Sequence, residues 1–512
     1  MYLTQGLHRA LQQTPDATMT VFRDRRRSFR EVADRVARLA GALRALGVRD
    51  GERVAMLAQN SDRYHEYLLA VPWANGVLNP VNIRWSPAEI AYSLQDSDTR
   101  VLFVDVAFAC LVPAIKQAWP ELATVIHTGD GSVPDGCVSS EDLIARHEPV
   151  EDARRGGNEL AGLFYTGGTT GFPKGVMLSH ANVLTSSYAL LTPGFAFKPG
   201  GIYLHAAPMF HLADLMAWNA QLLQGGRHVF IPSFEPVAVM RAIEQHRVTD
   251  ALLVPTMVQT LIDHPAIADY DLTSFRAVFY AAAPIPQALL ERAMRVFPNA
   301  EFVQGYGMTE LSPLATLLSP ADHQKKHLLR SAGRAAPCAE VRIVDPDGAE
   351  VPRGTVGEVA VRGGNVMLGY WNKPEETAAA IRDGWMHTGD GAYMDDEGYV
   401  YIVDRLKDMI ITGGENVYSA EVENAVGQHP AVAACAVVGV PDADWGERVH
   451  AVVVLHPGAE ITAGEIREHT KTLIAGYKCP RSVEFVDALP LSGAGKVLKR
   501  ELRNRYAGPT SR

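Results

Sequence analysis

Short apolar runs alternate with helical patterns through the first part of the chain, and this alternation constrains the fold more than any other feature. Apolar runs lie at residues 53–58, 76–81 and 100–105, and segments with helical spacing separate them. One helix opens with the capping box Ser28-Phe-Arg-Glu31, and another opens at Ser86 with proline in the first helical position. Such a rhythm predicts a mostly parallel sheet covered by helices, with ligand sites at the carboxyl ends of its strands.

The alternation resumes after a loop at 134–157 and changes character near residue 341. Further strands are expected at 160–165, 228–231, 251–254, 277–280 and 301–304. From 341 to 403, short strands separated by turn residues predict a small β-rich subdomain. Beyond 411, helices are expected at 419–427, 463–473 and 497–506, and strands at 432–440, 449–455 and 482–486.

These boundaries predict an α/β protein with at least two domains, because 512 residues exceed what one hydrophobic core usually organises. The large N-terminal domain would span 1–403, with mostly parallel sheets covered by helices and the β-rich subdomain at about 341–403. Residues 404–411 would connect it to a small α+β C-terminal domain at 412–512.

Composition excludes several classes of function. The chain has 48 Lys and Arg against 58 Asp and Glu, a net charge of −10, so nucleic acid is not an expected partner. The longest apolar stretch, 431–440, is too short for a transmembrane segment, and the first twenty residues lack a signal-peptide pattern. The five cysteines show no CxxC spacing. We therefore expect a cytoplasmic protein with reduced thiols.

The densest chemical signal is the segment from Tyr165 to Gly175, which reads Tyr-Thr-Gly-Gly-Thr-Thr-Gly-Phe-Pro-Lys-Gly. Its glycines allow close approach of backbone N–H groups to a ligand, its threonines add hydroxyl donors, and Lys174 adds positive charge. This favours a polyphosphate cradle over a flexible surface turn. It is not a Walker A loop, because the lysine lies between Pro173 and Gly175.

This segment closely resembles the phosphate-binding signature of the class I adenylate-forming superfamily, which includes acyl- and aryl-CoA synthetases, nonribosomal adenylation domains and beetle luciferases. Other segments resemble motifs of the same family, in the same order, along nearly the whole chain. The resemblance implies an acyl-CoA synthetase whose small-molecule partners are a carboxylic acid, ATP with Mg²⁺, and coenzyme A. Such an enzyme forms acyl-AMP first and the thioester second.

The resemblance also implies a nucleotide site. In the second signature, Gln304–Glu310, Tyr306 would pack on adenine, Thr309 would contact the α-phosphate and Glu310 would hold Mg²⁺. The implied ATP and AMP contacts are Thr166, Gly167, Gly168, Thr169, Thr170, Lys174, Ala282, Ala283, Pro284, Gly305, Tyr306, Gly307, Asp390 and Arg405.

The C-terminal region resembles the mobile domain of the family. The loop Pro490–Lys496 resembles the one that carries the catalytic lysine of adenylation, where Lys496 would stabilise developing charge. Lys407 matches the hinge position about which the domain rotates between half-reactions, although a solvated linker lysine is the alternative. The implied catalytic residues are Lys496, Thr309, Glu310 and His211.

The acyl and CoA contacts implied by the resemblance are less specific. His211 follows Phe210 where the amino-acid-activating branch has an Asp, which favours an acid without an α-amine; a packing role fits His211 equally. The implied acyl pocket is Phe210, His211, Tyr280, Ala281 and Gly305. The implied CoA contacts are Arg84, Gly413, Gly414, Trp445 and Lys478, although Trp445 reads equally as a half-buried surface aromatic.

Several alternatives stay open at this point. The acid is a medium- or long-chain fatty acid or an aryl acid of the cinnamate or benzoate type. A stand-alone ligase that loads an acyl carrier protein shares the first step, and Arg84 and Trp445 argue mildly against it. A luciferase-like oxygenase would need a specialised substrate, and the absent Gly-Lys-Ser/Thr argues against a P-loop kinase. The sequence does not determine the oligomeric state, and a homodimer is compatible with it.

Overall fold

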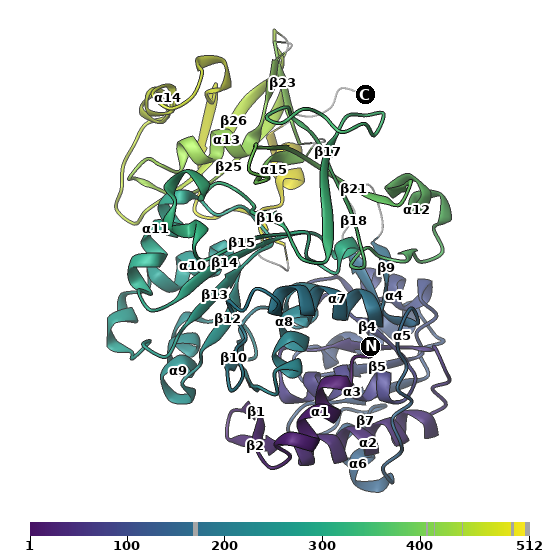
Figure 1. The fold of residues 1–512 in the computed structure, drawn as a ribbon. Helices are drawn as coiled ribbons and strands as arrows, with labels where there is room; N and C mark the ends of the chain where they lie inside the picture. Colours follow the sequence, from purple (N-terminus) through teal and green to yellow (C-terminus); the bar gives the residue numbers. More distant parts are fainter. Residues whose placement is uncertain (167–172, 406–407, 414, 443, 493–495, 507–512) are drawn as a thin grey trace.

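The structure is a computed structural model that describes residues 1–166, 173–405, 408–413, 415–442, 444–492 and 496–506. Within these ranges, two large sheets with covering helices form the lower and middle parts of the molecule in Figure 1, and two smaller sheets lie above them. This agrees with the α/β fold predicted from the sequence.

The first large sheet has a parallel centre and an antiparallel edge. Its eight described strands run in the order β19-β9-β8-β4-β3-β5-β6-β7. From β8 to β7 the neighbours are parallel, whereas β9 and β19 pair antiparallel at the edge. The strands are β3 (Arg53–Leu57), β4 (Val77–Pro80), β5 (Val101–Val104), β6 (Thr124–His127), β7 (Val138–Ser139), β8 (Leu160–Thr166), β9 (Lys174–Ser179) and β19 (Gly369–Tyr370).

The second large sheet follows the same plan. Nine strands of the described chain run in the order β16-β15-β14-β13-β12-β10-β11-β1-β2, parallel from β14 to β1 and antiparallel at both edges. They are β1 (Thr18–Phe22), β2 (Arg25–Ser28), β10 (Ile202–His205), β11 (Arg227–Phe230), β12 (Asp250–Leu253), β13 (Ala277–Tyr280), β14 (Glu301–Tyr306), β15 (Thr316–Leu318) and β16 (Arg334–Ala335).

The helices cover the faces of these two sheets, as expected for βαβ crossovers. They are α1 (Gln5–Gln13), α2 (Phe29–Ala45), α3 (Asp62–Trp73), α4 (Pro87–Asp96), α5 (Val112–Ala118), α6 (Ser140–Arg146), α7 (His180–Leu191), α8 (Leu212–Leu223), α9 (Pro236–His246), α10 (Pro255–Ile262) and α11 (Gln287–Val296). Both predicted caps form: Ser28 and Ser86 accept from the backbone N–H groups of Glu31 and Glu89.

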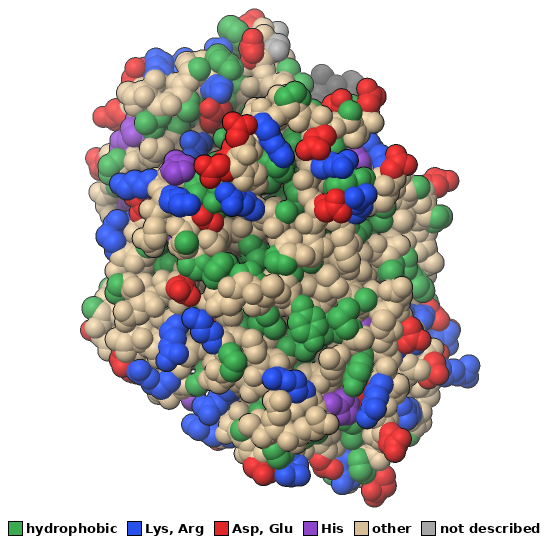
Figure 2. All heavy atoms as spheres, viewed as in Figure 1, with side chains coloured by type: hydrophobic (Ala, Val, Ile, Leu, Met, Phe, Trp, Pro, Cys, Tyr) green, Lys and Arg blue, Asp and Glu red, His purple; other side chains and the backbone are tan. Residues whose placement is uncertain are grey.

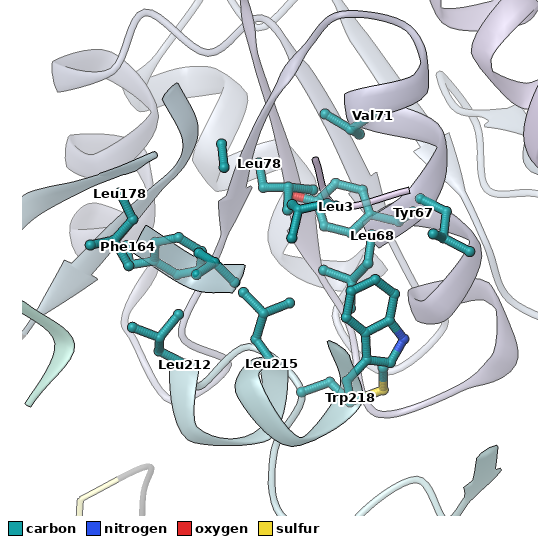
Figure 3. Close-up of a cluster of buried hydrophobic side chains, with 14 of the residues drawn as sticks. Leu3, Tyr67, Leu68, Val71, Leu78, Phe164, Leu178, Leu212, Leu215 and Trp218 are labelled. Atoms are coloured by element: carbon teal, nitrogen blue, oxygen red, sulfur yellow. The ribbon is translucent and has the colours of Figure 1, made fainter. Parts of the chain in front are cut away.

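Helix α8 is buried along its whole length: all twelve of its residues are buried, as are the twelve of α3. Leu215 and Trp218 pack in the core of the first sheet, together with Tyr67 and Phe164 (Figure 3). The opposite side of α8, including Met216, packs in a cluster that contains residues of β10, β12, β13 and β14. The helix is mostly apolar, and its buried polar residues Asp214, Asn219 and Gln221 form hydrogen bonds with neighbouring elements. Packing on both sides fixes the two sheets relative to each other.

Two smaller sheets complete the described chain. The first contains β17 (Ala339–Val344), β18 (Gly357–Gly363), β20 (Ile381–Arg382), β21 (Trp385–Met394) and β22 (Val400–Arg405), with α12 (Pro374–Ala380) beside it. The second contains β23 (Ile410–Thr412), β24 (Glu415–Val417), β25 (Val432–Asp442), β26 (Gly446–Leu455) and β27 (Ser482–Phe485), with α13 (Ser419–Val426), α14 (Ala463–Lys471) and α15 (Lys499–Tyr506).

Several strands of the structure were not predicted from the sequence. One of them is β9, which lies between the Gly/Thr segment and α7 and pairs antiparallel with β8. Val176 and Leu178 of β9 are fully buried, and Ser179 then caps α7. The alternation of buried residues was overlooked because the glycines and threonines before it dominate the local composition.

The described part of the chain contains no helix long and apolar enough to cross a membrane. On the face shown in Figure 2, basic and acidic side chains are interspersed over the C-terminal end of the molecule. Charge on this face therefore does not form a field of one sign.

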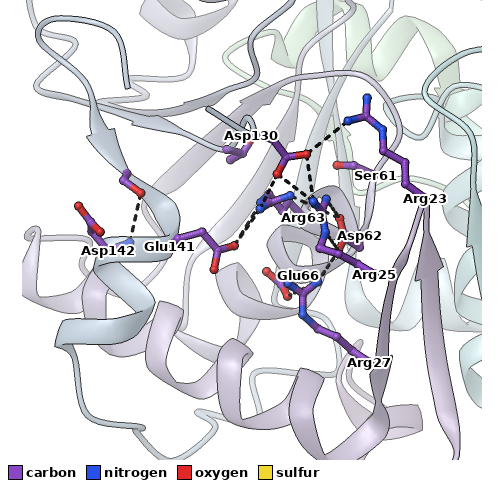
Figure 4. Close-up of polar contacts among 12 residues, drawn as sticks. Arg23, Arg25, Arg27, Ser61, Asp62, Arg63, Glu66, Asp130, Glu141 and Asp142 are labelled. Atoms are coloured by element: carbon purple, nitrogen blue, oxygen red, sulfur yellow. Dashed lines mark hydrogen bonds and ion pairs between the residues drawn. The ribbon is translucent and has the colours of Figure 1, made fainter. Parts of the chain in front are cut away.

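An ionic network joins the edge of the second sheet to helices of the first (Figure 4). The buried carboxylate of Asp62, on α3, receives hydrogen bonds from Arg25 of β2 at 2.9 and 3.0 Å and a further one from Arg27. Arg63 extends the network to Glu141 of α6 and to Asp130. Because Asp62 and Arg63 are buried, their charges depend on these partners for compensation.

Replacing Asp62 should therefore destabilise the fold strongly. Asp62→Ala leaves two arginines without this carboxylate, and we expect a loss of about 3–5 kcal/mol, measured by urea denaturation. The matched control is Asp16→Ala, because Asp16 pairs with Arg30 at the exposed surface, with side chains 79% and 64% accessible. The control should leave the urea midpoint unchanged, because solvent screens an exposed ion pair. Equal losses in the two variants would contradict a structural role for the buried network.

Candidate active site

A cleft of about 2460 Å³ lies between the large sheets and the C-terminal α+β unit. It opens at the carboxyl ends of β13 and β14, where parallel strands place their following loops. The predicted residues that line it are Arg84, Thr166, Lys174, Phe210, His211, Ala281, Ala282, Ala283, Pro284, Gly305, Tyr306, Gly307, Thr309, Glu310, Asp390, Lys478 and Lys496.

Other predicted residues are not brought into this cleft. Tyr280 is fully buried, and its hydroxyl pairs with His323 at 2.9 Å. Trp445 is 43% exposed and lies against the Arg481 guanidinium, 3.9 Å from the ring centroid. A Cβ on Gly413 would come within 2.8 Å of the same indole, so the glycine leaves room for the tryptophan ring. Gly167, Gly168, Thr169, Thr170, Lys407 and Gly414 lie outside the described residues, as does the side chain of Arg405.

A tyrosine and a carboxylate meet across two sheets at one wall of the cleft. The hydroxyl of Tyr306, at the end of β14, donates to Asp390 Oδ2 on β21 at 2.7 Å. The backbone N–H of Asp390 donates to Thr388 Oγ1 at 3.1 Å, which fixes the carboxylate further. An aromatic face beside a fixed carboxylate suits a nucleoside, because the base can stack while the carboxylate accepts from sugar hydroxyls.

A second carboxylate is held by a tyrosine that the sequence analysis missed. Tyr370 donates to Glu310 Oε1 at 2.8 Å, and Lys174 Nζ lies 4.9 Å from the centroid of its ring. Tyr370 lies on β19, which pairs with β9 opposite Val176, so the edge of the first sheet positions it. The arrangement places a cation and an oriented carboxylate side by side, as phosphate and a divalent cation require.

The backbone beside these side chains is tightly packed. A Cβ on Gly307 would lie 2.0 Å from the Pro313 carbonyl oxygen, and one on Gly305 would lie 2.6 Å from the Phe279 ring. Ala282 adopts a positive φ of 77°, which is uncommon for a residue with a Cβ. Such strained positions cluster at functional sites, where the surrounding structure holds them.

His211 precedes α8 and acts as its N-cap. Its Nδ1 accepts from the backbone N–H of Ala213 at 3.3 Å, so the neutral ring carries its proton on Nε2. Burial, with a smaller contribution from the charge of Lys496, lowers the pKa of His211 to about 4. The C-terminal unit thus brings Lys496 close enough to act electrostatically on the first residue before α8.

Asp214, three residues beyond His211, does not line the cleft. Its carboxylate is buried, accepts from the Tyr203 hydroxyl at 2.8 Å and pairs with His205 Nδ1 at 2.7 Å. It is therefore not placed to pair with an ammonium group in the cleft. The prediction that this site favours an acid without an α-amine agrees with that geometry.

Arg84 and Lys478 approach the cleft from opposite sides. Arg84 follows β4 of the first sheet, whereas Lys478 belongs to the C-terminal unit and pairs with Glu421 at 2.8 Å. Trp445 and Gly413 lie elsewhere on that unit, so the four described CoA candidates do not form one site in this arrangement.

Comparison with known proteins follows the same division of the chain. The family described as AMP-binding enzyme matches residues 7–371, and the AMP-binding enzyme C-terminal domain matches 421–496. A feruloyl-CoA synthase from an Amycolatopsis species is 42% identical over 97% of this chain and 98% of its own length. A fatty acid–[acyl-carrier-protein] ligase, ScoC, from Streptomyces coeruleorubidus is 36% identical over 98% of this chain and 96% of its own.

Solved structures extend the similarity to the fold. The anthranilate CoA ligase AuaEII, in complex with anthranoyl-AMP, superposes with a TM-score of 0.92 at 27% identity, covering 99% of this chain and 97% of the other.

Proposed function

The chain belongs to the AMP-binding enzyme family, and from this membership we propose that its acid substrate is an aromatic propenoic acid of the ferulate class. The chain is an AMP-forming acid–CoA ligase, with ATP and CoA as substrates. The observation that carries the aromatic assignment is the 42% identity to a feruloyl-CoA synthase over nearly the full length of both chains.

The lining of the cleft beyond His211 supports an aromatic acid. Phe210, Ala213, Met216, Phe279 and Ala281 line this part with apolar atoms. Aromatic and aliphatic side chains favour a flat, apolar ring, which gains from burial and from edge or face contacts with phenylalanine. The small alanines leave width for a substituted ring.

In the proposed first step, a carboxylate oxygen attacks the α-phosphorus of ATP, and the bond from that phosphorus to the oxygen bridging to the β-phosphate breaks. Pyrophosphate leaves and acyl-AMP remains. Tyr306 would stack on adenine, Asp390 with Arg405 would hold the ribose, and Thr309 would contact the α-phosphate. Lys174 and the threonines of the segment 165–175 would hold the β- and γ-phosphates, and Ala282, Ala283 and Pro284 would flank the adenine. Catalysis here is mainly positioning and charge stabilisation.

Mg²⁺ fits the residues present at this wall. Glu310 offers a carboxylate oriented by Tyr370, and a hard cation prefers carboxylate and phosphate oxygens. When bound, the ion would neutralise charge on the phosphates. Glu310 would hold it, and Tyr370 would keep that carboxylate in place.

In the proposed second step, the CoA thiol releases its proton to water and the thiolate sulfur attacks the acyl carbonyl carbon. The bond from that carbon to the AMP oxygen breaks, AMP leaves and the thioester forms. We propose that the C-terminal domain turns about Lys407 between the steps. The turn would withdraw Lys496 and bring Gly413, Gly414 and Trp445 toward the CoA path lined by Arg84 and Lys478. Lys496 lines the cleft, whereas Trp445, on the same small domain, does not. This difference supports two orientations of the C-terminal domain. His211, with its proton on Nε2, would donate a hydrogen bond to an acyl oxygen.

We also propose that this chemistry takes place in the cytoplasm. None of the five cysteines, all of which lie within the described residues, forms a disulfide.

The acid and the acceptor are tested together. We expect ferulate to give AMP and pyrophosphate with at least about tenfold higher kcat/KM than palmitate, benzoate or phenylalanine, and AMP release to require CoA. A preference for palmitate would contradict the aromatic assignment. Pyrophosphate release with acyl transfer only to a carrier protein would favour an activity like that of ScoC. ADP as the product would contradict an AMP-forming reaction.

Lys496 should matter in the first step alone. Lys496→Ala should lower pyrophosphate release with ferulate about a hundredfold, because charge developing at the α-phosphate loses its cation. Thioester formation from supplied feruloyl-AMP should persist. Lys471→Ala is the control, since Lys471 is a lysine of the same domain paired with Glu468. Equal loss of both half-reactions in Lys496→Ala would refute the assigned role.

Tyr370 should act through Glu310. Tyr370→Phe removes the hydroxyl but keeps the ring beside Lys174, so MgATP should bind about tenfold more weakly while ATP in EDTA binds unchanged, measured by calorimetry. Tyr399→Phe is matched, because Tyr399 is buried and donates to Asp322 at 2.7 Å outside the cleft. Equal weakening with and without Mg²⁺ would show that Tyr370 does not position the metal ligand.

A further inference from the structure

Lys496 is joined by backbone hydrogen bonds to the chain just before it and lies close to a helix. The backbone N–H of Ser492 donates to the Lys496 carbonyl at 2.7 Å, and the Lys496 N–H donates to Ser492 Oγ at 3.1 Å. The Leu498 N–H donates to the Pro490 carbonyl at 2.8 Å. The chain continues into α15, which begins three residues later at Lys499, so the position of this helix bears on that of Lys496.

Lys499 anchors α15 at a buried ionic cluster. Its Nζ lies 2.7 Å from Glu423 Oε1 and also donates to Ser419 Oγ, and both partners lie on α13. Glu423 Oε1 accepts in addition from the Val437 N–H of β25 at 2.8 Å. Burial lowers the pKa of Lys499, but Glu423 and Asp404 outweigh that effect and raise it. The lysine is therefore charged, and its position is tied to α13 and β25.

Asp404 reaches the same cluster from the N-terminal part of the molecule. It lies on β22, opposite Gly391 of β21, and so belongs to the β-rich sheet. Its Oδ2 accepts from the backbone N–H of Ser419, the first residue of α13, at 2.7 Å. The N-cap residue, Tyr418, makes no side-chain capping bond, so Asp404 serves the helix end in its place.

We propose that Asp404 and Lys499 are positioning residues for adenylation, which together hold the C-terminal domain in the orientation that brings Lys496 into the cleft that His211 also lines. This inference rests on the proposed function, in which Lys496 acts in the first step only. Asp404 precedes the proposed hinge at Lys407 and Ser419 follows it. The bond between them therefore has to break whenever the domain turns, and the cluster favours the first half-reaction over the second.

If Asp404 and Lys499 served only the stability of the fold, their loss would have a different effect. Loss of a buried charge pair would destabilise the C-terminal domain and reduce both half-reactions together. Positioning instead requires a split, in which adenylation falls and thioester formation from a supplied adenylate is kept or increased. The two half-reactions of one variant therefore separate the two explanations.

The experiment uses full-length Asp404→Asn, which keeps an acceptor for the Ser419 N–H but removes the charge. With the acid that the wild-type enzyme activates best, we expect pyrophosphate release without CoA to fall about tenfold. Thioester formation from the supplied acyl-adenylate should be unchanged or faster. Lys499→Met should shift the ratio in the same direction, and Lys499→Arg should retain most adenylation, because it keeps the charge.

Asp345→Asn is the matched control. Asp345 also accepts backbone N–H groups, from Asp347 and Ala349 at 3.0 and 2.9 Å, but in a turn of the β-rich sheet away from α13. This variant should leave both half-reactions unchanged. Equal losses in both half-reactions of Asp404→Asn, or no loss of adenylation, would overturn the inference. A wild-type enzyme that releases no pyrophosphate with any acid would refute the proposed function itself.

Discussion

The complete burial of α8 between the two large sheets is the constraint on which the site depends. Its apolar side chains contact both cores, and several of its buried polar side chains form hydrogen bonds with neighbouring elements. Trp218 donates to His65 at 2.8 Å, Asn219 donates to Ser187 at 3.0 Å, and Asp214 joins Tyr203 and His205. A helix held on every side by packing and hydrogen bonds cannot shift without disturbing both sheets. Phe210 and His211 directly precede this helix, so their positions are fixed as well.

The polar side of the cleft is organised by a different device. Hydrogen bonds from tyrosine hydroxyls fix the rotamers of the Asp390 and Glu310 carboxylates before a ligand binds. Each tyrosine lies on a strand of one sheet while its carboxylate partner lies on another element, so assembly of the sheets creates the site. Preorganised groups of this kind need little rearrangement when charge develops in a reaction.

Much of this could be predicted from sequence, and the reasons for success and failure are physical. Strand β13 was predicted to the residue, since an apolar run between turns is a local signal. The candidate nucleotide contacts came from the resemblance to family signatures rich in glycine, and Gly307 is one position where close packing, against the Pro313 carbonyl, leaves no room for a Cβ. Tyr370 was missed because its role arises from the pairing of β19 with β9, which brings residues far apart in sequence together. The position of Trp445 relative to the cleft depends on the orientation of the whole C-terminal domain, which no local sequence pattern encodes.

The edge strand β2 has a consequence for how the molecule meets other chains. Arg25, Arg26 and Arg27 follow one another along the outer edge of the second sheet, and Arg25 and Arg27 are anchored by Asp62. An edge strand exposes unpaired backbone groups that can template the addition of a foreign strand. Charged side chains along an edge strand discourage the backbone pairing from which β-aggregates grow. The same side chains that join the two sheets therefore also protect this edge against self-association.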